Sequence, residues 1–93
     1  KRLRDAGADA VILVGHVGND CNATSKFGIW RESTVQDSTC SGTDEVSKLI
    51  KSLPAGTVDG VVQGHRHRFS HTFIQGVPVM GTVNGGFYFN ILY

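Results

Sequence analysis

The feature that most constrains the fold is a pair of short apolar runs, each of which is followed directly by the dipeptide Gly-His. Residues 10–14 read Ala-Val-Ile-Leu-Val, and residues 58–63 read Val-Asp-Gly-Val-Val-Gln. Runs of this kind, bounded by glycine and rich in β-branched side chains, are typical of buried strands. Because residues 44–53 between them have the pattern of a helix, the order strand, helix, strand predicts a parallel pair of strands with a right-handed crossover.

The helix expected over residues 44–53 has both a start signal and a stop signal. Thr43 is a suitable N-cap, and Asp44 and Glu45 favour the positive end of the helix dipole. Pro54 ends the helix. Apolar residues recur at i, i+3, i+4 and i+7, which gives one apolar stripe made of Val46, Leu49, Ile50 and Leu53. We expect this stripe to face the core.

The remaining secondary structure lies at the two ends of the chain. Residues 1–6 read as the last turns of a helix that stops at Gly7. Residues 69–74, 77–83 and 87–93 have the composition of strands and are separated by glycine-rich turns. These three runs predict an antiparallel meander beside the parallel pair, so the expected fold class is α/β.

Three histidines follow the two apolar runs. His16 follows the first run, and His65 and His67 follow the second within Gly-His-Arg-His. Because parallel strands have their carboxyl ends at one edge and strand side chains alternate, we expect the three imidazoles at one rim, with His65 and His67 pointing the same way. Neutral imidazole is the commonest protein ligand of first-row transition metals. The alternative is three independent polar side chains in loops.

Two cysteines bracket a long polar connection. Cys21 is followed directly by Asn-Ala-Thr, which is an N-glycosylation sequon at Asn22. Together with Cys40 it favours an oxidising secretory compartment and a Cys21–Cys40 disulfide, which would stabilise the fold by about 3 kcal/mol in the chain-entropy model. Two free thiols and a chance sequon are the alternative. The lack of a Cys-x-x-Cys spacing disfavours a zinc site with His16.

Length and charge limit the class of protein and its partners. The chain has 93 residues, of which 40% are hydrophobic, and a net charge of +1, so it is one small domain or part of a larger one. This charge indicates neither a nucleic-acid surface nor a polybasic membrane patch. No apolar run approaches the roughly 20 residues of a membrane-spanning helix. Because the chain opens at Lys1 within the end of a helix, we expect a fragment or a piece of a processed precursor.

Four segments carry a resemblance to a known family. They are residues 11–18, the cysteine-bracketed loop 21–40, residues 53–67 and residues 76–79, which follow one another over nearly the whole chain. Gly-His-x-His gains specificity here because it follows Val-Asp-Gly-Val-Val and precedes Gly-Val-Pro-Val. The chain resembles the calcineurin-like metallophosphoesterases, in the branch of secreted 5′-nucleotidases and 2′,3′-cyclic-nucleotide phosphodiesterases. The resemblance implies that residues 1–93 are the incomplete, C-terminal part of a catalytic domain with an αββα sandwich fold.

The same resemblance implies a metal-dependent phosphoesterase with two divalent ions, which can be Zn, Mn, Fe, Mg or Ca. The positions that match the family's ligands assign His16 and His65 to one ion and His67 to the other. Two ions roughly 3.5–4 Å apart can clamp a phosphate and activate a water as the nucleophile. The implied substrate is a nucleotide, a cyclic nucleotide or another phosphate ester. The implied location is secreted, at the cell surface or in the lumen of the secretory pathway.

The chain departs from the family's pattern because the upstream motifs are not in it. Those motifs carry the bridging aspartate, the other Asp, His and Asn ligands and the acid histidine, so the catalytic residues are expected upstream of Lys1. Asp9 and Asp20 do not fit those motifs. Arg66 stands where the family often has a small polar residue, either as a phosphate-facing charge or as an ordinary surface arginine. By itself the chain is expected to hold at most an incomplete metal site.

Two other classes of function compete with the hydrolase. One is a non-catalytic binding or structural protein that keeps the same fold and its histidines. The other is a small secreted module whose histidines bind one zinc ion without catalysis. Upstream motifs such as Asp-x-His would favour the enzyme, and the metal stoichiometry would identify the zinc module.

Overall fold

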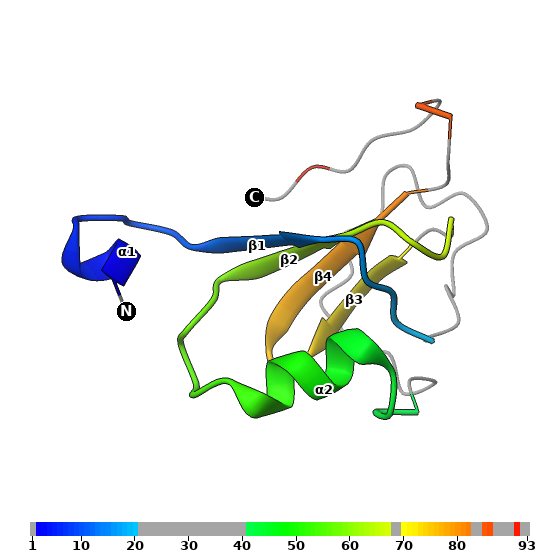
Figure 1. Ribbon diagram of the computed structural model, residues 1–93, viewed down its shortest axis with the longest axis horizontal. Coiled ribbons are helices and arrows are strands. Elements are labelled where there is room, and N and C mark those ends of the chain that lie inside the picture. Colours follow the sequence, from blue (N-terminus) through cyan, green and yellow to red (C-terminus); the bar gives the residue numbers. More distant parts are fainter. Residues whose placement is uncertain (1, 21–40, 68–69, 83–84, 87–90, 92–93) are drawn as a thin grey trace.

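The computed structural model describes residues 2–20, 41–67, 70–82, 85–86 and 91. These residues form a small mixed α/β domain with strands β1 (Ile12–Gly15), β2 (Gly60–Gln63), β3 (Ser70–Ile74) and β4 (Val77–Gly81) and helices α1 (Arg2–Asp5) and α2 (Glu45–Ser52). The order across the sheet is β1-β2-β4-β3. Helix α1 lies beyond the amino end of β1 (Figure 1). Within the described part of the chain, neither helix has the length and apolar character needed to cross a membrane.

Strands β1 and β2 are parallel neighbours, as the strand–helix–strand order predicts. Their pairing starts at Ile12 and Gly60 rather than at residues 10 and 58. The start is later because a side chain takes part in the first contacts. Val11 N donates to Asp59 Oδ2 at 2.8 Å, and Asp59 N donates to Val11 O at 2.8 Å. The Asp59 carboxylate thus stands in for a strand carbonyl, and the regular ladder begins one residue further on.

The last two strands differ from the predicted meander in their order. β3 and β4 are antiparallel, as predicted, but β4 lies beside β2 and is parallel to it, so β3 takes the edge of the sheet. β4 is rich in apolar side chains, and Val79 and Met80 are buried, which favours its central position. Pro78 has no N–H, but pairing with β2 starts only at Val79. The third predicted run, residues 87–93, lies outside the described residues except for Ile91.

Helix α2 starts one residue later than predicted, and its N-cap is Asp44 rather than Thr43. Asp44 has an extended backbone, and its Oδ1 accepts a hydrogen bond from Ser47 N at 2.7 Å. Its Oδ2 accepts a second bond from Ser47 Oγ at 2.9 Å. A carboxylate is a stronger acceptor than a hydroxyl and also favours the positive end of the helix dipole, so Asp44 takes the cap. The Thr43 hydroxyl is instead 2.8 Å from Ser41 Oγ.

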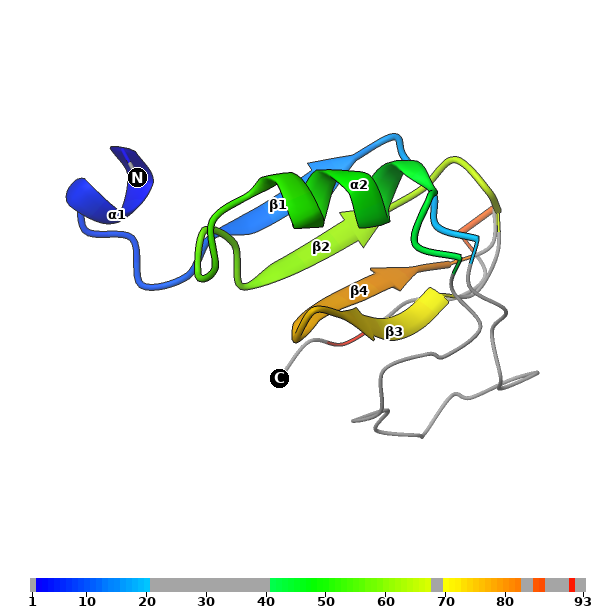
Figure 2. The ribbon, with the colours of Figure 1, turned by 90° about the horizontal axis from the view of Figure 1, so that it is seen from below.

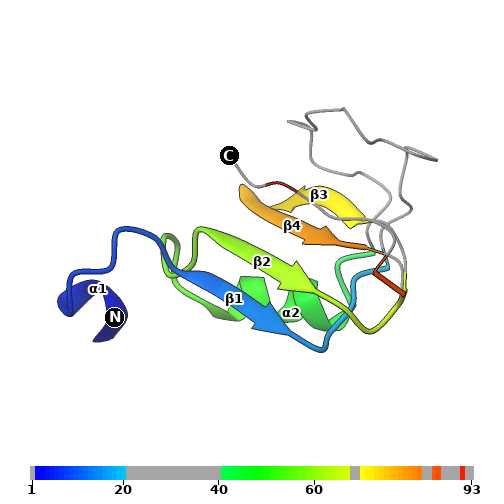
Figure 3. The same ribbon diagram turned by 90° about the horizontal axis from the view of Figure 1, so that it is seen from above.

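The hydrophobic core lies between α2 and one face of the sheet. Figures 2 and 3 view the sheet from opposite sides and show α2 in front of it in one view and behind it in the other. The predicted stripe of α2 faces this core, with Val46 and Ile50 buried and Leu49 and Leu53 half-buried. The sheet contributes Val61, Ile74 and Val79. Each fully buried side chain of this kind stabilises the fold by about 1.5–3 kcal/mol.

The opposite face of β1 is less well covered. Leu13 packs against the core, and because strand side chains alternate, Ile12 and Val14 face the other way. Ile12 is 40% exposed and Val14 is 75% exposed. A parallel strand that is apolar on both faces is typical of a sheet covered on both sides. The described residues therefore leave apolar surface of β1 open to solvent.

Helix α1 is joined to the start of β2 through one arginine. Gly7 has a left-handed backbone (φ +97°) and ends the helix as predicted. Arg4 Nη2 donates to Gly56 O at 2.9 Å and to Asp59 Oδ2 at 2.8 Å. The Val11 N–H, followed by the Arg4 guanidinium, lowers the pKa of the Asp59 carboxyl. Asp59 therefore connects α1, β1 and β2 at the amino end of the parallel pair.

Candidate functional site

The carboxyl ends of β1 and β2 bring two of the predicted histidines together. Gly15 pairs with Gln63 where the two strands end, so the chain leaves the sheet at neighbouring points. His65 Nδ1 is 2.9 Å from His16 Nε2, and the two ring centroids are 4.7 Å apart with the planes inclined at 73°. Both side chains are exposed. The expectation that histidines after the two apolar runs share one rim is confirmed for His16 and His65.

The distance between the two ring nitrogens fits two ligands of one metal ion after a small adjustment. Tetrahedral coordination with metal–nitrogen bonds of about 2.0–2.1 Å holds two nitrogens about 3.4 Å apart. At the observed 2.9 Å the N–H of one ring donates a hydrogen bond to the unprotonated nitrogen of the other. Binding of an ion would displace this proton and widen the pair by about 0.5 Å. Since both rings are exposed, solvent rather than packed side chains surrounds much of the space that they need.

His67 lies in the same loop, and its backbone differs from the prediction. β2 ends at Gln63, so the alternation that would point His65 and His67 the same way does not apply. Instead both have a left-handed backbone, with φ 30° for His65 and φ 52° for His67. Histidine adopts this conformation more often than most residues do, and such conformations concentrate at functional sites. Within the described ranges, no group of three or more His, Cys, Asp or Glu side chains is arranged to hold a metal ion.

The loop that carries His16 is held by the residues that follow it. Val17 packs against the core. Gly18 is buried, and a Cβ at this position would lie 2.2 Å from Arg66 Cγ and 3.2 Å from Arg66 Nε. The stem of Arg66 thus crosses from the loop after β2 onto the loop after β1, while the side chain remains exposed as a whole. This packing contact gives Arg66 a role at the surface that does not require a phosphate.

Gln63, the last residue of β2, binds the same loop from its buried side. Its Oε1 accepts hydrogen bonds from Asn19 N at 3.2 Å and from Asn19 Nδ2 at 3.3 Å. Gln63 is 7% exposed and Asn19 is 3% exposed. Gly81 leaves room for this side chain, because a Cβ there would lie 3.0 Å from Gln63 Cγ. Neither amide is predicted from the sequence, and the signal that could have indicated them is a glutamine at the end of an apolar strand, directly before Gly-His.

Asp20 joins the same loop to the segment before α2. Its Oδ1 accepts a hydrogen bond from Ser41 N at 3.1 Å, and its Oδ2 accepts one from the Ser41 hydroxyl. The Ser41 hydroxyl, as the largest of several hydrogen-bonding effects, lowers the pKa of Asp20 from 3.8 to about 2. Asp20 is therefore ionised at neutral pH and already bonded. Asp9 precedes β1 and so lies toward the opposite end of that strand from His16.

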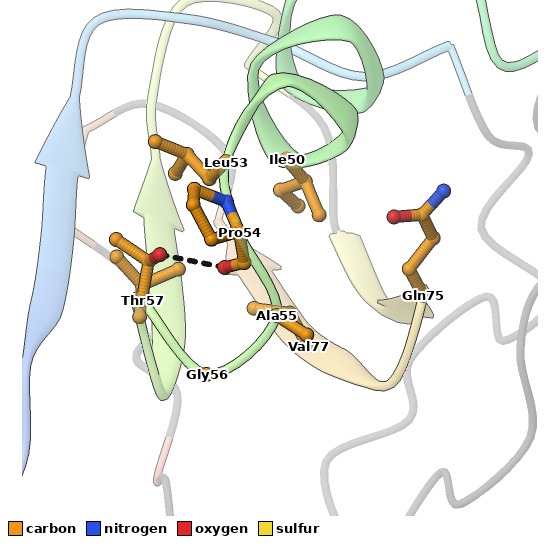
Figure 4. A pocket seen from close by; sticks show the side chains of 9 residues that line it. Ile50, Leu53, Pro54, Ala55, Gly56, Thr57, Gln75 and Val77 are labelled. Atoms are coloured by element: carbon orange, nitrogen blue, oxygen red, sulfur yellow. Dashed lines mark hydrogen bonds between the residues drawn. The ribbon is translucent and has the colours of Figure 1, made fainter.

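A small hollow lies at the amino ends of β2 and β4 (Figure 4). Leu53, Pro54 and Val77 are among the residues that line it. Thr57 Oγ1 donates to Pro54 O at 2.6 Å and fixes the turn that borders the hollow. The histidines follow the carboxyl ends of the strands, so this hollow is separate from the histidine rim.

The other predicted site residues are not among those that the structure describes. Cys21, Asn22 and Cys40 fall in the range 21–40, so the disulfide and the glycan stay predictions. Comparison of the chain with models of known protein families, with curated proteins and with solved structures found no match. The chemistry that the rim offers is a pair of exposed imidazoles with a third in the same loop, which can bind a divalent cation or exchange a proton.

Proposed function

We propose that this chain is part of the catalytic domain of a metal-dependent phosphoesterase similar to the secreted 5′-nucleotidases. In this proposal His16 and His65 are ligands of one divalent ion. The observation that carries it is the 2.9 Å approach of His65 Nδ1 to His16 Nε2 at the ends of two parallel strands. These are the two positions that the resemblance assigns to the same ion. Independent loop histidines, which were the competing interpretation, are not expected to meet at hydrogen-bond distance.

The proposed substrate is a nucleotide, a cyclic nucleotide or another phosphate ester. Divalent ions at this rim would supply the charge that binds the phosphate and acidifies a water. The chain's own contribution is to hold neutral nitrogen ligands at an exposed edge that a substrate can reach. His67, in the loop shared with His65, is the proposed ligand of the second ion. The exposed position of all three side chains supports access of the substrate.

The chain supplies only part of the site in this proposal. Its three proposed ligands are neutral, whereas divalent ions held close together also need carboxylate ligands. We expect the bridging carboxylate and the catalytic residues from the upstream half of the domain. The exposed apolar side chains of Ile12 and Val14 support the presence of further structure over β1. A secreted or secretory-pathway location depends on the Cys21–Cys40 pair and the sequon at Asn22.

A non-catalytic binding protein with the same histidines is the second candidate. The paired imidazoles of His16 and His65 are also compatible with this candidate, because two neutral ligands can hold an ion without catalysis. Two imidazoles alone bind a zinc ion weakly, and such a site has no catalytic acid or base. In this case the rim would serve recognition or structure instead of hydrolysis.

Nucleotide hydrolysis with added Mn²⁺ or Zn²⁺ separates the two candidates. The intact protein should be active, and the 93-residue chain alone should not be, because none of its carboxylates stands in a motif that matches the family's bridging ligand of the second ion. Full activity of the chain alone would show that the missing half is not needed. An intact protein that binds the metals and does not hydrolyse phosphate esters would favour the binding protein.

A further inference from the structure

One amide connects the two loops that carry the paired histidines. Gln63 stands two positions before His65, and its Oε1 accepts two hydrogen bonds from Asn19, which stands three positions after His16. Gln63 and Asn19 are buried, whereas both histidines are exposed. The connection between the two loops is therefore buried, whereas the two imidazoles that the loops carry are exposed.

Because the bonded amides are buried, this connection favours one position of the loop after β1. A buried amide that loses its partner is strongly unfavourable, so the loop after β1 is stable where Asn19 N and Nδ2 both reach Gln63 Oε1. The Gln63 side chain lies close against β4, since a Cβ at Gly81 would stand 3.0 Å from its Cγ and 3.5 Å from its Nε2. Strand β2 thus holds Gln63 Oε1 in place, and the hydrogen bonds to this oxygen hold the loop after β1.

A second contact between the loops lies on the exposed side. The stem of Arg66 covers Gly18, but Arg66 is exposed and its side chain has many rotamers. This contact adapts when the loop moves, whereas the amide pair does not. Of the two contacts, the buried one is suited to set a distance.

We infer that Gln63 is a positioning residue: through Asn19 it sets the separation of His16 and His65 and thereby the affinity of this pair for a divalent ion. The inference rests on the proposed function, because the affinity has a role only if the pair binds metal. The positioning itself can be measured without metal, from the hydrogen bond that the two rings share.

Three variants of the intact protein test the role of Gln63. Gln63→Met removes the acceptor at nearly constant side-chain length, and Gln63→Glu keeps an oxygen acceptor at the same place. Gln75→Met is the matched control, because Gln75 is exposed between β3 and β4, away from the histidines. Ring-nitrogen NMR shifts of His16 and His65 report their shared hydrogen bond without metal. Titration with Zn²⁺ gives the affinity, and thermal unfolding gives the stability.

We expect Gln63→Met to abolish the shared hydrogen bond of His16 and His65 and to weaken Zn²⁺ binding by about 10-fold, the lower end of the range for groups bonded directly to a metal ligand, because Gln63 acts through Asn19. Gln63→Glu should restore the ring-nitrogen shifts and most of the affinity. Gln75→Met should change neither quantity. If Gln63→Met does not fold, Asn19→Ala removes the bond from Nδ2 to Gln63, keeps the bond from the backbone N, and should give the same changes at smaller size.

Unchanged ring-nitrogen shifts and unchanged Zn²⁺ affinity in Gln63→Met, with only a lower unfolding temperature, would overturn the inference and leave Gln63 as a structural residue. The same holds for Asn19→Ala if it is the variant that folds. A wild-type protein that shows the paired rings but binds no Zn²⁺ would instead contradict the proposed function, while the positioning of the pair would stand.

Discussion

The two ends of the β1–β2 pair are each crossed by a side-chain connection, and the two connections differ in burial and charge. At the amino end, Asp59 accepts hydrogen bonds from Val11 N and Arg4, and both charged side chains are substantially exposed. At the carboxyl end, Gln63 accepts two bonds from Asn19, and both side chains are buried. Exposed ion pairs contribute little because water and salt screen them. A buried amide that loses its partner costs about 1–3 kcal/mol. The end that carries the exposed histidines is therefore the one fixed from within.

The largest expected effect falls on activity and at the carboxyl end alone. In the intact protein, His16→Ala or His65→Ala should remove a ligand of one ion and His67→Ala a ligand of the other, and each should lower phosphate-ester hydrolysis by orders of magnitude. The unfolding temperature should change little, because all three side chains are exposed. Lys48→Ala, at an exposed position of α2, is the control for both measurements. Variants that retain full turnover with added metal would remove these histidines from the site.

The second effect is on the free energy of unfolding, and it concerns both ends of the β1–β2 pair because one hydrophobic core lies beneath them. Ile50 is 4% exposed and packs between α2 and the sheet. Ile50→Ala should lower the free energy of unfolding by about 2–5 kcal/mol, measured by urea denaturation. Lys48→Ala on the exposed side of the same helix should stay within about 0.5 kcal/mol of wild type. Equal losses in the two variants would mean that α2 does not cover the sheet as described.

The third effect sharpens the contrast between the buried and the exposed contact at the carboxyl end. Gly18→Ala places a Cβ 2.2 Å from Arg66 Cγ, so the arginine stem must move. We expect a loss of about 1–3 kcal/mol in unfolding free energy, as for other overpacked sites. Gly64→Ala is the matched control, since a Cβ there meets nothing within 4 Å. The double variant Gly18→Ala/Arg66→Ala should recover part of the loss, and a double variant no more stable than Gly18→Ala would place the clash elsewhere.

The smallest effects concern pH. Hydrogen bonds lower the pKa of Asp20 near the carboxyl end to about 2 and lower that of Asp59 at the amino end below 3.8. A carboxyl whose pKa is lower in the folded protein stabilises the fold above its unfolded pKa, and this contribution is lost as the pH falls through the folded pKa. For Asp20 the loss should occur between pH 3.8 and about 2.

Urea unfolding of wild type and Asp20→Asn between pH 6 and 2 measures this contribution. The variant should be less stable than wild type near neutral pH, and the difference should shrink on acidification. Asp59→Asn should show the same trend at the amino end. A difference between wild type and Asp20→Asn that stays constant down to pH 2 would show that the Asp20–Ser41 hydrogen bonds do not favour the ionised carboxyl.

The elements that the sequence predicts well are those whose signals are local. The helix over residues 44–53 follows from the spacing of its apolar stripe, and the parallel pair follows from two apolar runs on either side of it. The exact ends of these elements do not follow. The Asp59 carboxylate accepts a bond from Val11 N in place of a strand carbonyl, and Asp44 takes the N-cap position that Thr43 could also fill. The position of β4 between β2 and β3 also does not follow, because a turn fixes that two strands pair and not which of them lies inward.

The candidate site shows the same division. His16 and His65 are predicted to meet because each follows a strand, and parallel strands end at the same edge. Gln63 and Asn19 are missed because their hydrogen bonds join residues 44 positions apart, and neither residue belongs to a repeated pattern. No local sequence pattern predicts that Gln63 Oε1 accepts two hydrogen bonds from Asn19 in the other loop.

The strand–helix–strand order, the buried face of α2 and the edge that carries His16 and His65 follow from local sequence, because alternation, helical spacing and chain direction act within a few residues. The central position of β4, the capping of α2 by Asp44 and the connection from Gln63 to Asn19 become visible in the folded chain alone. These depend on which groups remain without a partner after the chain has folded, and in this protein the partners of those groups come from distant segments or from competing neighbours.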